Sequence, residues 1–301
     1  MTPSRARVAL AVAAGIAAAL LYAGQFVISR WSFQRTLTPW DLAAVRFVVA
    51  GSLLLPIVVR HGFRNAAGIG WRRAIVLATI VGAPYTLILF AGLALAPASH
   101  GALIVTGGTP VVSSALTWLW FGTRPSTART SGIALILAGL VGVTWSGVIG
   151  SSGALVMLGD LVLVVNAVMW ALFTVLARQW EVDPTRGTAI VWVLALVYLP
   201  IYLVVFGPRA LHAPATELVV QGVYQGLGVA IVALMLYAFA IRVLGATTGS
   251  LFMPLVPVFA VLLAIPALAE VPSAPQLAGM VGVSVGMALA SGYPRQDVTG
   301  A

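Results

Sequence analysis

The chain has 301 residues, of which 61% are hydrophobic and only 8% are charged. A soluble domain carries about 25% charged residues, so this composition excludes an ordinary water-soluble protein and indicates that lipid surrounds most of the surface. The net charge of +9 comes from arginine, because the sequence contains no lysine. The arginines are spread between apolar runs, which argues against nucleic-acid binding. The absence of cysteine excludes disulfides and thiolate metal sites.

Apolar stretches long enough to cross a bilayer, about 20 residues each, recur along the whole chain. The first follows Arg5 and Arg7 and is longer than the apolar part of a signal peptide, so we expect it to be retained as a helix. The shortest connections, near Pro97 and Gly245, require antiparallel hairpins. The ten expected spans are Val8–Ile28, Trp40–Val59, Ala74–Leu95, Ser99–Phe121, Ser131–Ile149, Leu155–Ala177, Thr188–Phe206, Val219–Ile241, Gly245–Leu268 and Gln276–Ser291.

The second half of the sequence repeats the first at an offset of about 147 residues. We therefore divide the chain into residues 1–150 and 151–301, with five expected spans in each. Because five is odd, the second repeat must enter the membrane upside down, as in many carriers. The predicted fold is an all-α integral membrane protein of ten transmembrane helices in two inverted five-helix repeats. The clearest matches are Pro110, Pro125, Gly132 and Gly139 with Pro257, Pro272, Gly279 and Gly286.

The placement of arginine predicts the orientation, because cytoplasmic segments are enriched in positive charge. With a cytoplasmic N-terminus, the opposite side carries only Arg30, Arg35 and Arg209, and almost all other arginines face the cytoplasm. We expect a multi-pass protein of the cytoplasmic (inner) membrane with its N-terminus and C-terminus in the cytoplasm.

The order and spacing of four segments resemble the drug/metabolite transporter superfamily in its two-repeat, ten-helix EamA branch. The segments are LAAVRFVVAG at 42–51, APASHGALIVTGGTPVV at 96–112, GDLVLVVNAVMWALFTVLAR at 159–178 and LGATTGSLFMPLVPVFAVLLAIPALAEVPS at 244–273. The resemblance implies a carrier of small metabolites, and amino-acid exporters of the YddG type share this architecture. One departure is that the family often has Glu before the final turn of both halves, whereas here Glu270 aligns with Thr123.

A carrier site needs polar groups near the bilayer midplane, where such groups are costly without a partner. The resemblance implies that helices 1, 3, 4, 6, 8 and 9 line a central cavity. Amides and hydroxyls on these spans can hold a zwitterion, and aromatic faces can receive an apolar ring or an ammonium group. The expected substrate-binding residues are Tyr22, Gln25, Tyr85, Thr109, Trp118, Asn166, Trp170, Tyr224, Tyr237 and Phe252.

Structural roles compete with these assignments. Gln25 and Asn166 suit helix packing as well as a cavity, and threonine or serine can bond to the backbone of its own helix. Aromatic residues near span ends fit an interfacial belt better than a site. The residues assigned to this belt are Trp31, Trp40, Trp71, Trp192 and Tyr293.

Some charged residues also have two interpretations. Arg46 lies inside a span. Its functional interpretation is a contact for an anion, or a pair with Asp41 or with another helix. The favoured interpretation is a structural arginine bound to carbonyl groups. His100 fits a polar helix start better than a pH sensor. Asp160 reads as a charge at a helix N-terminus. Residues 107–110 make the fourth span either a hinge or a fixed kink.

These features predict a secondary exporter of small amphipathic metabolites, most of all amino acids, that works by alternating access. The chain has no Walker-type phosphate loop, and His61, His100 and His212 lie on different loops. We therefore expect no enzyme, no catalytic residue, no metal and no cofactor. The alternatives are a carrier of drug-like or nucleotide-sugar-like solutes, or a non-transport membrane assembly protein. The expected partners are a small-molecule substrate and the bilayer, with the chain a monomer or weak homo-oligomer.

Overall fold

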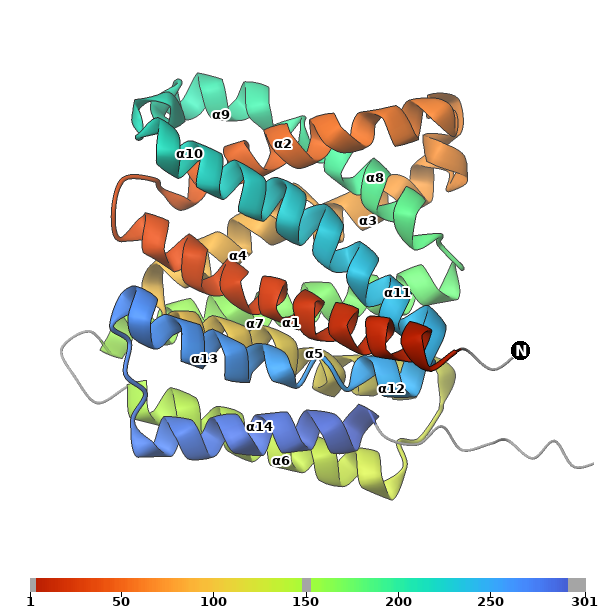
Figure 1. Ribbon diagram of the computed structural model, residues 1–301, viewed down its shortest axis with the longest axis vertical. Helices are drawn as coiled ribbons and strands as arrows, with labels where there is room; N and C mark the ends of the chain where they lie inside the picture. The colour runs from red at the N-terminus through yellow and green to blue at the C-terminus, as the bar shows by residue number, and fades with distance from the viewer. Residues whose placement is uncertain (1–3, 148–152, 292–301) are drawn as a thin grey trace, which may run out of the picture.

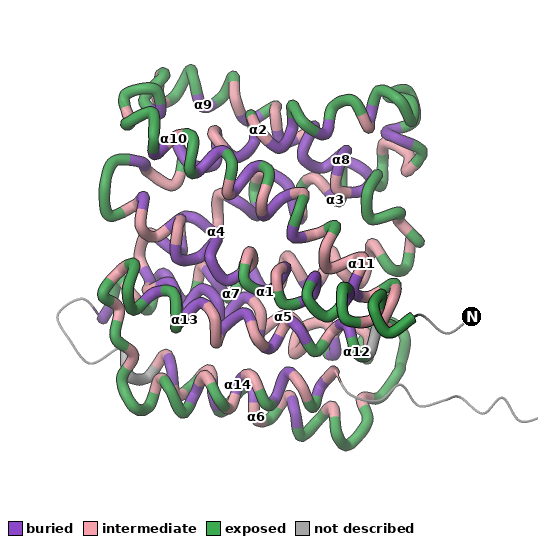
Figure 2. Tube along the Cα trace, viewed as in Figure 1, coloured by how far each residue is buried: buried purple, intermediate pink, exposed green. Residues whose placement is uncertain are grey.

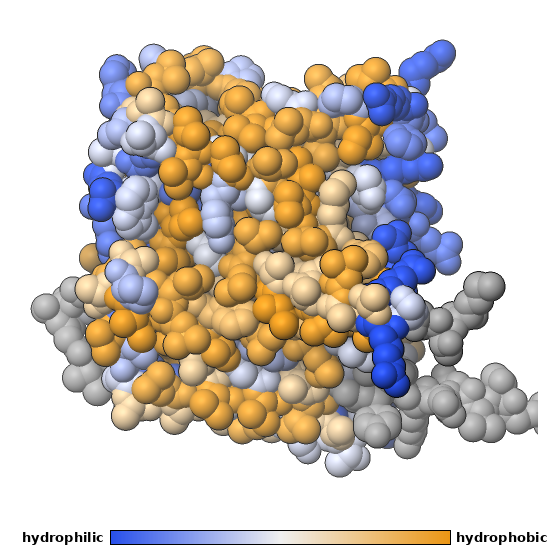
Figure 3. All heavy atoms as spheres, viewed as in Figure 1, coloured by the Kyte–Doolittle hydropathy of each residue, from blue (hydrophilic) through white to orange (hydrophobic). Residues whose placement is uncertain are grey.

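The computed structural model describes residues 4–147 and 153–291. Within them, ten helical segments are long and apolar enough to cross a membrane, which confirms the predicted ten-helix fold. The helices lie side by side (Figure 1). Apolar side chains cover the visible face of the bundle between two more hydrophilic ends (Figure 3), as a protein surrounded by lipid requires.

The two ends of the bundle need names that do not depend on orientation. The terminal face is the end where the first helix begins at Arg5 and the last described helix ends at Ser291. The distal face is the opposite end, where the first helix ends at Phe33. Both ends are visible in Figure 1, with the terminal face on the right.

Local sequence signals start and stop the helices of the first half. Thr38 and Asp41 form a capping box at the start of the second helix, with Pro39 in its first turn. The helix of the fourth span ends at Phe121, and the next residue, Gly122, adopts the left-handed conformation that favours glycine. The helices of this half are α1 (Arg5–Phe33), α2 (Pro39–Arg60), η1 (Phe63–Gly68), α3 (Trp71–Val81), α4 (Ala83–Leu95), α5 (Ala98–Phe121) and α6 (Thr127–Gly147).

The spans of the second half are less regular. The seventh span is divided near Leu196, and the eighth contains the π-helical segment η3. The ninth is interrupted by a turn at residues 251–254. The helices are α7 (Gly153–Gln179), α8 (Pro184–Ala195), α9 (Tyr198–Phe206), η2 (Arg209–His212), α10 (Ala215–Gln221), η3 (Gly222–Ala233), α11 (Leu234–Leu244), α12 (Ala246–Ser250), α13 (Leu255–Leu268) and α14 (Ala274–Ser291).

These interruptions lie partway along the spans rather than at their ends. In the first half, α3 gives way to α4 at Gly82, whose ψ is −128°. Irregular backbone at membrane depth is tolerated where protein or a cavity surrounds it, and in carriers it marks the substrate site. In contrast, α5 runs unbroken through Pro110, whereas its repeat counterpart separates between α12 and α13.

The two halves pack against each other reciprocally. The first span, α1, lies against α11 and α13, and the corresponding span of the second half, α7, lies against α4 and α5. The last spans of the two halves, α6 and α14, pair with each other at one edge of the bundle (Figure 1). Such an exchange is what two inverted repeats produce. Buried residues concentrate between these elements in the middle of the bundle (Figure 2).

Four glycines from the sequence repeat bring the backbones of α6 and α14 into contact. A Cβ at Gly139 would stand 2.6 Å from the carbonyl oxygen of Gly279, and a Cβ at Gly132 would stand 2.6 Å from that of Gly286. Close approach through glycine is a common way for membrane helices to associate. Gly279 is the repeat counterpart of Gly132, and Gly286 is that of Gly139, so the two contacts are related by the repeat.

We expect Gly139→Ala to lower the melting temperature of the purified protein, whereas Gly142→Ala on the same helix should not. A new methyl group at Gly139 meets the Gly279 backbone and costs about 1–3 kcal/mol. At Gly142 the nearest atom is 3.8 Å away, and alanine improves helix propensity by about 1 kcal/mol. Thermal unfolding in detergent measures both. Equal melting temperatures for the two variants would contradict the close approach of α6 and α14.

Candidate functional site

A buried cation lies where α1, α2 and η3 meet. Arg46 is 5% exposed, and its Nη1 lies 3.5 Å from Oε1 of Gln25 and 3.4 Å from Oε1 of Gln225. The amide of Gln225 is oriented from its other end, because its Nε2 donates to Ser29 Oγ at 2.8 Å and to the Gln25 carbonyl at 3.3 Å. Both halves of the chain therefore contribute polar groups around Arg46.

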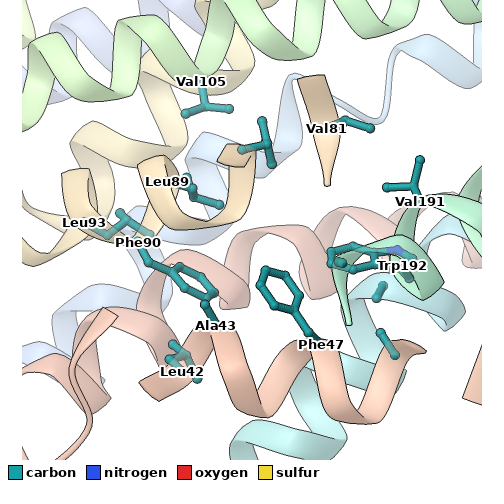
Figure 4. Packing of buried hydrophobic residues seen from close by; sticks show 14 of the residues in the cluster. Leu42, Ala43, Phe47, Val81, Leu89, Phe90, Leu93, Val105, Val191 and Trp192 are labelled. Carbon is teal, nitrogen blue, oxygen red and sulfur yellow. The ribbon is translucent and has the colours of Figure 1, made fainter. Parts of the chain in front are cut away.

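Aromatic rings cover the guanidinium group of Arg46. Its Cζ lies 4.7 Å from the centroid of the Trp192 ring and 5.8 Å from that of Phe90. Figure 4 shows both rings beside Phe47 along α2. Cation–π contacts offset part of the cost of a charge inside a membrane, which is roughly 2.5–3.5 kcal/mol on insertion scales.

The assignment of Trp192 to an interfacial belt is wrong, because only 8% of its surface is exposed. The ring is directed toward α2 and lies 6.1 Å from Phe47. Its position near the start of the expected seventh span suggested an interface. The helix α8 begins earlier, at Pro184, so Trp192 lies deeper than the sequence indicated.

Arg46 does not pair with Asp41, one of the partners that the sequence suggested. Asp41 instead accepts hydrogen bonds from Thr38 and, at 2.5 Å, from the hydroxyl of Tyr202. The Nε of Arg46 is buried without a hydrogen-bond partner. Among the residues that the structure describes, no carboxylate forms an ion pair with Arg46.

A second group of predicted site residues lies between α4 and α7. Asn166 is fully buried, and its Nδ2 donates to the carbonyl oxygen of Tyr85 at 2.8 Å. The rings of Tyr85 and Trp170 are 5.5 Å apart. The amide oxygen of Asn166 has no hydrogen-bond partner. This arrangement leaves an unpaired acceptor on α7, one helical turn before Trp170.

The two groups adjoin each other. Tyr85 interacts electrostatically with Arg46, and Tyr22 does so with Arg46, Tyr85 and Tyr237. The structure therefore joins six of the predicted residues to one arginine, three of them directly. Gln25, Tyr22 and Tyr85 lie next to Arg46, Asn166 and Trp170 contact Tyr85, and Tyr237 lies near Tyr22. We call this set the central cluster, with Arg46 included: Tyr22, Gln25, Arg46, Tyr85, Asn166, Trp170 and Tyr237.

Two further predicted residues pack against glycines of α1 instead. Tyr224 donates its hydroxyl to the Leu21 carbonyl at 3.1 Å and fills the space over Gly24. Phe252, in the turn before α13, packs over Gly15. Their large rings fit because the facing positions have no side chain, which is a packing role that the sequence did not predict.

Thr109 and Trp118 lie outside the central cluster. Thr109 donates a hydrogen bond to the Val105 carbonyl of its own helix at 2.7 Å. This bond to the helix backbone is the alternative to substrate binding that the sequence left open. Trp118 is 51% exposed in the last turn of α5, where Leu119, Trp120 and Phe121 are also exposed. Trp118 therefore lies near the end of its span rather than at the midplane, and its side chain points away from the cluster.

A network of polar contacts joins the two halves at the distal face. Arg30 donates to Glu270 at 3.4 Å and to the carbonyls of Leu93 and Ala94 at 3.0 and 2.7 Å. Glu270 also accepts from the backbone N–H of Ala98 at 3.0 Å. One carboxylate thus connects the ends of α1 and α13 with the start of α5. Thr123, its repeat counterpart, lies at the terminal face and provides no equivalent contact.

His100 lies in the first turn of α5, as its favoured interpretation expected, and it pairs with Asp160 near the distal face. His100 is fully buried, and its Nδ1 lies 2.9 Å from Asp160 Oδ1. Its Nε2 lies 3.2 Å from Nε2 of Gln276. Asp160 is buried within α7 rather than at its start. The packing of α5 on α7 decides this pairing, which no local pattern indicates.

A third distal contact ties α10 to α1. The buried carboxylate of Glu217 accepts hydrogen bonds from Ser32, at 2.6 Å, and from Thr36. Gln221, one turn later, donates to Ser32 and to the Ile28 carbonyl, both at 2.8 Å. An apolar cleft also lies between α2, α8 and α11, beside Leu54, Thr188 and Met235, and none of the predicted site residues lines it.

Comparison with known proteins identifies the family. Residues 9–145 and 157–292 each match the EamA-like transporter family. The chain belongs to this family. The EamA-like chain is therefore a multi-pass membrane transporter with a small-molecule substrate, and EamA-like transporters are not enzymes.

Two relatives extend over most of the chain. An "Uncharacterized transporter" of Archaeoglobus fulgidus is 25% identical over 256 residues, which is 84% of this EamA-like chain and 87% of that protein. A solved structure named only "Crystal structure of protein" aligns with a TM-score of 0.62 at 21% identity, covering 93% of this chain and 96% of the other. The second likeness shows that the fold is shared.

Three residues at Arg46 were not among the predicted site residues: Ser29, Trp192 and Gln225. The sequence offered one signal for Gln225, a long amide within an otherwise apolar span. Ser29 has no such signal, since serine is common in membrane helices. Its role depends on the position of η3 in the folded protein.

Proposed function

We propose that this EamA-like transporter is a secondary exporter of small amphipathic metabolites, most of all amino acids. The observation that carries the proposal is the central cluster. It combines one buried cation, one unpaired amide oxygen and several aromatic rings inside an apolar bundle. Such a set suits a solute with charged ends and an apolar side chain. The proposed substrate contacts are Tyr22, Gln25, Tyr85, Asn166, Trp170 and Tyr237.

The proposed mechanism is alternating access by movement of the halves 1–150 and 151–301. The central cluster contains residues of both halves, so a relative movement changes its shape. At the distal face the contacts of Arg30, His100 and Glu217 join the halves, which supports a state closed on that side. Opening the distal face requires these hydrogen bonds to break and others to replace them.

The proposed location is the cytoplasmic membrane with the terminal face toward the cytoplasm. The arginines of the connecting segments gather at this face, for example Arg60, Arg72, Arg73 and Arg186, and such enrichment favours the cytoplasmic side. With this orientation, the hydrogen bonds at the distal face support a state closed toward the outside. The oligomeric state consistent with this proposal is a monomer or a weak homo-oligomer.

The deciding experiment is flux in proteoliposomes. We expect the purified chain to move radiolabelled amino acids down a gradient, and vesicles without protein to move none. A panel of nucleotide sugars and of drug-like cations serves as the comparison. Transport of these solutes without amino-acid flux would replace the proposed substrate, and no flux of any solute would favour an assembly role.

A further inference from the structure

We propose that Arg46 is the receptor for a carboxylate of the transported solute, so that carboxylic acids and zwitterions are substrates and amines are not. The proposal rests on the proposed function, because it assigns a substrate class to the same site. The described part of the chain buries a cation at Arg46 and supplies no carboxylate to pair with it.

All acidic residues that the structure describes are engaged elsewhere or lie at the surface. The sequence has seven acidic residues. Of the described ones, Glu181 is exposed after α7 and Asp183 caps α8. The other four accept hydrogen bonds: Asp41 from Thr38 and Tyr202, Asp160 from His100, Glu217 from Ser32 and Thr36, and Glu270 from Arg30 and Ala98. A carboxylate for Arg46 must therefore come from outside this part of the chain.

The present contacts of Arg46 are neutral and easily exchanged. The two glutamine oxygens lie 3.4 and 3.5 Å from Nη1, longer than the usual 2.7–3.2 Å for an N–H···O bond. The Nε–H donor has no hydrogen-bond partner. A guanidinium group binds a carboxylate through two parallel N–H donors, and Nε is one of the donors that can form such a pair. The unused donor therefore matches the missing anion.

A purely structural arginine would be expected to make different contacts. An arginine that stabilises a membrane bundle bonds to backbone carbonyls or to a carboxylate, as Arg30 does at the distal face. Arg46 instead lies between aromatic rings that shield it from lipid without neutralising it. The rings and the neutral amides keep the full positive charge available to a ligand.

The test compares acids with their uncharged or cationic analogues. Binding to the purified full-length chain is measured by calorimetry for L-alanine, L-leucine and L-phenylalanine, for their amides, for the amines lacking the carboxylate and for the acids lacking the amine. We expect the wild-type chain to bind the carboxylate-bearing compounds at least about tenfold more tightly than the amides and amines, the effect of about one charge-assisted hydrogen bond.

Three variants assign this preference to Arg46. R46Q should bind acids and amides equally, and R46K should retain part of the preference, because a lysine ammonium has the charge without the paired donors. The matched control is R129Q, which removes a partly buried arginine bonded to Ser114 at 2.6 Å and should keep the full preference. If R46Q fails to fold, the R46K variant and the comparison of acids with amides in the wild-type chain still test the role of Arg46.

The outcomes separate this proposal from the proposed function. Equal wild-type binding of acids and amides, no binding of any carboxylate, or an unchanged preference in R46K and R46Q would overturn the role of Arg46. Amino-acid flux with equal flux of the amides would keep the exporter and reject the carboxylate receptor. Carboxylate binding that requires Arg46 without amino-acid flux would keep the receptor and reject amino-acid export.

Discussion

Trp170→Ala should reduce amino-acid flux about two- to thirtyfold while the protein remains folded. The ring of Trp170 lies 5.5 Å from that of Tyr85, one helical turn after Asn166, whose amide oxygen is unpaired. In the proposed site these rings contact the solute, and an aromatic contact with a cation contributes about 0.5–2 kcal/mol. Trp170 is only partly buried, so its truncation should leave a smaller unsupported cavity than the loss of Tyr85. Initial rates in proteoliposomes measure the effect.

The matched control for this variant is Trp120→Ala. Trp120 is 49% exposed in the last turn of α5 and contacts none of the central cluster. Its removal should leave flux and melting temperature near those of the wild-type chain. Wild-type flux in Trp170→Ala would remove this residue from the substrate site. A melting temperature far below that of the control would instead assign Trp170 to packing.

Glu270→Ala should increase the fraction of molecules that are open at the distal face by about tenfold. The substitution removes the acceptor of both Arg30 and the Ala98 backbone N–H. Hydrogen bonds to a charged group contribute about 1.5–3 kcal/mol. The side chains of Arg30 and Glu270 are 19% exposed, so water screens this pair and the lower end of the range applies.

The natural absence of cysteine makes this effect measurable. A single cysteine at Ala102, which is fully buried one turn after the start of α5, should react with a membrane-impermeant maleimide only when the distal face opens. Its labelling rate should rise in Glu270→Ala and stay constant in Glu181→Ala, which removes an exposed carboxylate at the other end of the bundle. An equal rate in all three backgrounds would show that Glu270 does not hold the distal face closed.

Several elements of the fold were readable from residues alone because their signals are local. The expected spans Trp40–Val59 and Ser99–Phe121 agree closely with α2 and α5, which local signals at Pro39 and Gly122 delimit. The glycines that match at the repeat offset all lie at close contacts, Gly139 with Gly279 and Gly132 with Gly286. The depth of Asn166 in its span also followed from counting.

The direction of side chains was not readable in this way. Trp118 and Trp170 are both tryptophans that the sequence assigned to one site, yet Trp118 is exposed on the last turn of α5 and Trp170 stacks near Tyr85. His100 and Asp160, separated by 60 positions, become hydrogen-bonded only because α5 packs along α7. Neither residue has a nearby partner in the sequence that would indicate this contact.

The sequence by itself determined that lipid surrounds most of the chain, how many spans it has and that the spans repeat. These features are readable because apolar length, arginine placement and matched prolines and glycines act within short segments. Only the tertiary structure decided which polar groups meet. The amide of Gln225 faces Arg46 because η3 is π-helical and lies against α1, where Ser29 and the Gln25 carbonyl orient it. Such contacts join residues almost 200 positions apart, and their geometry depends on the packing of whole helices rather than on any local pattern.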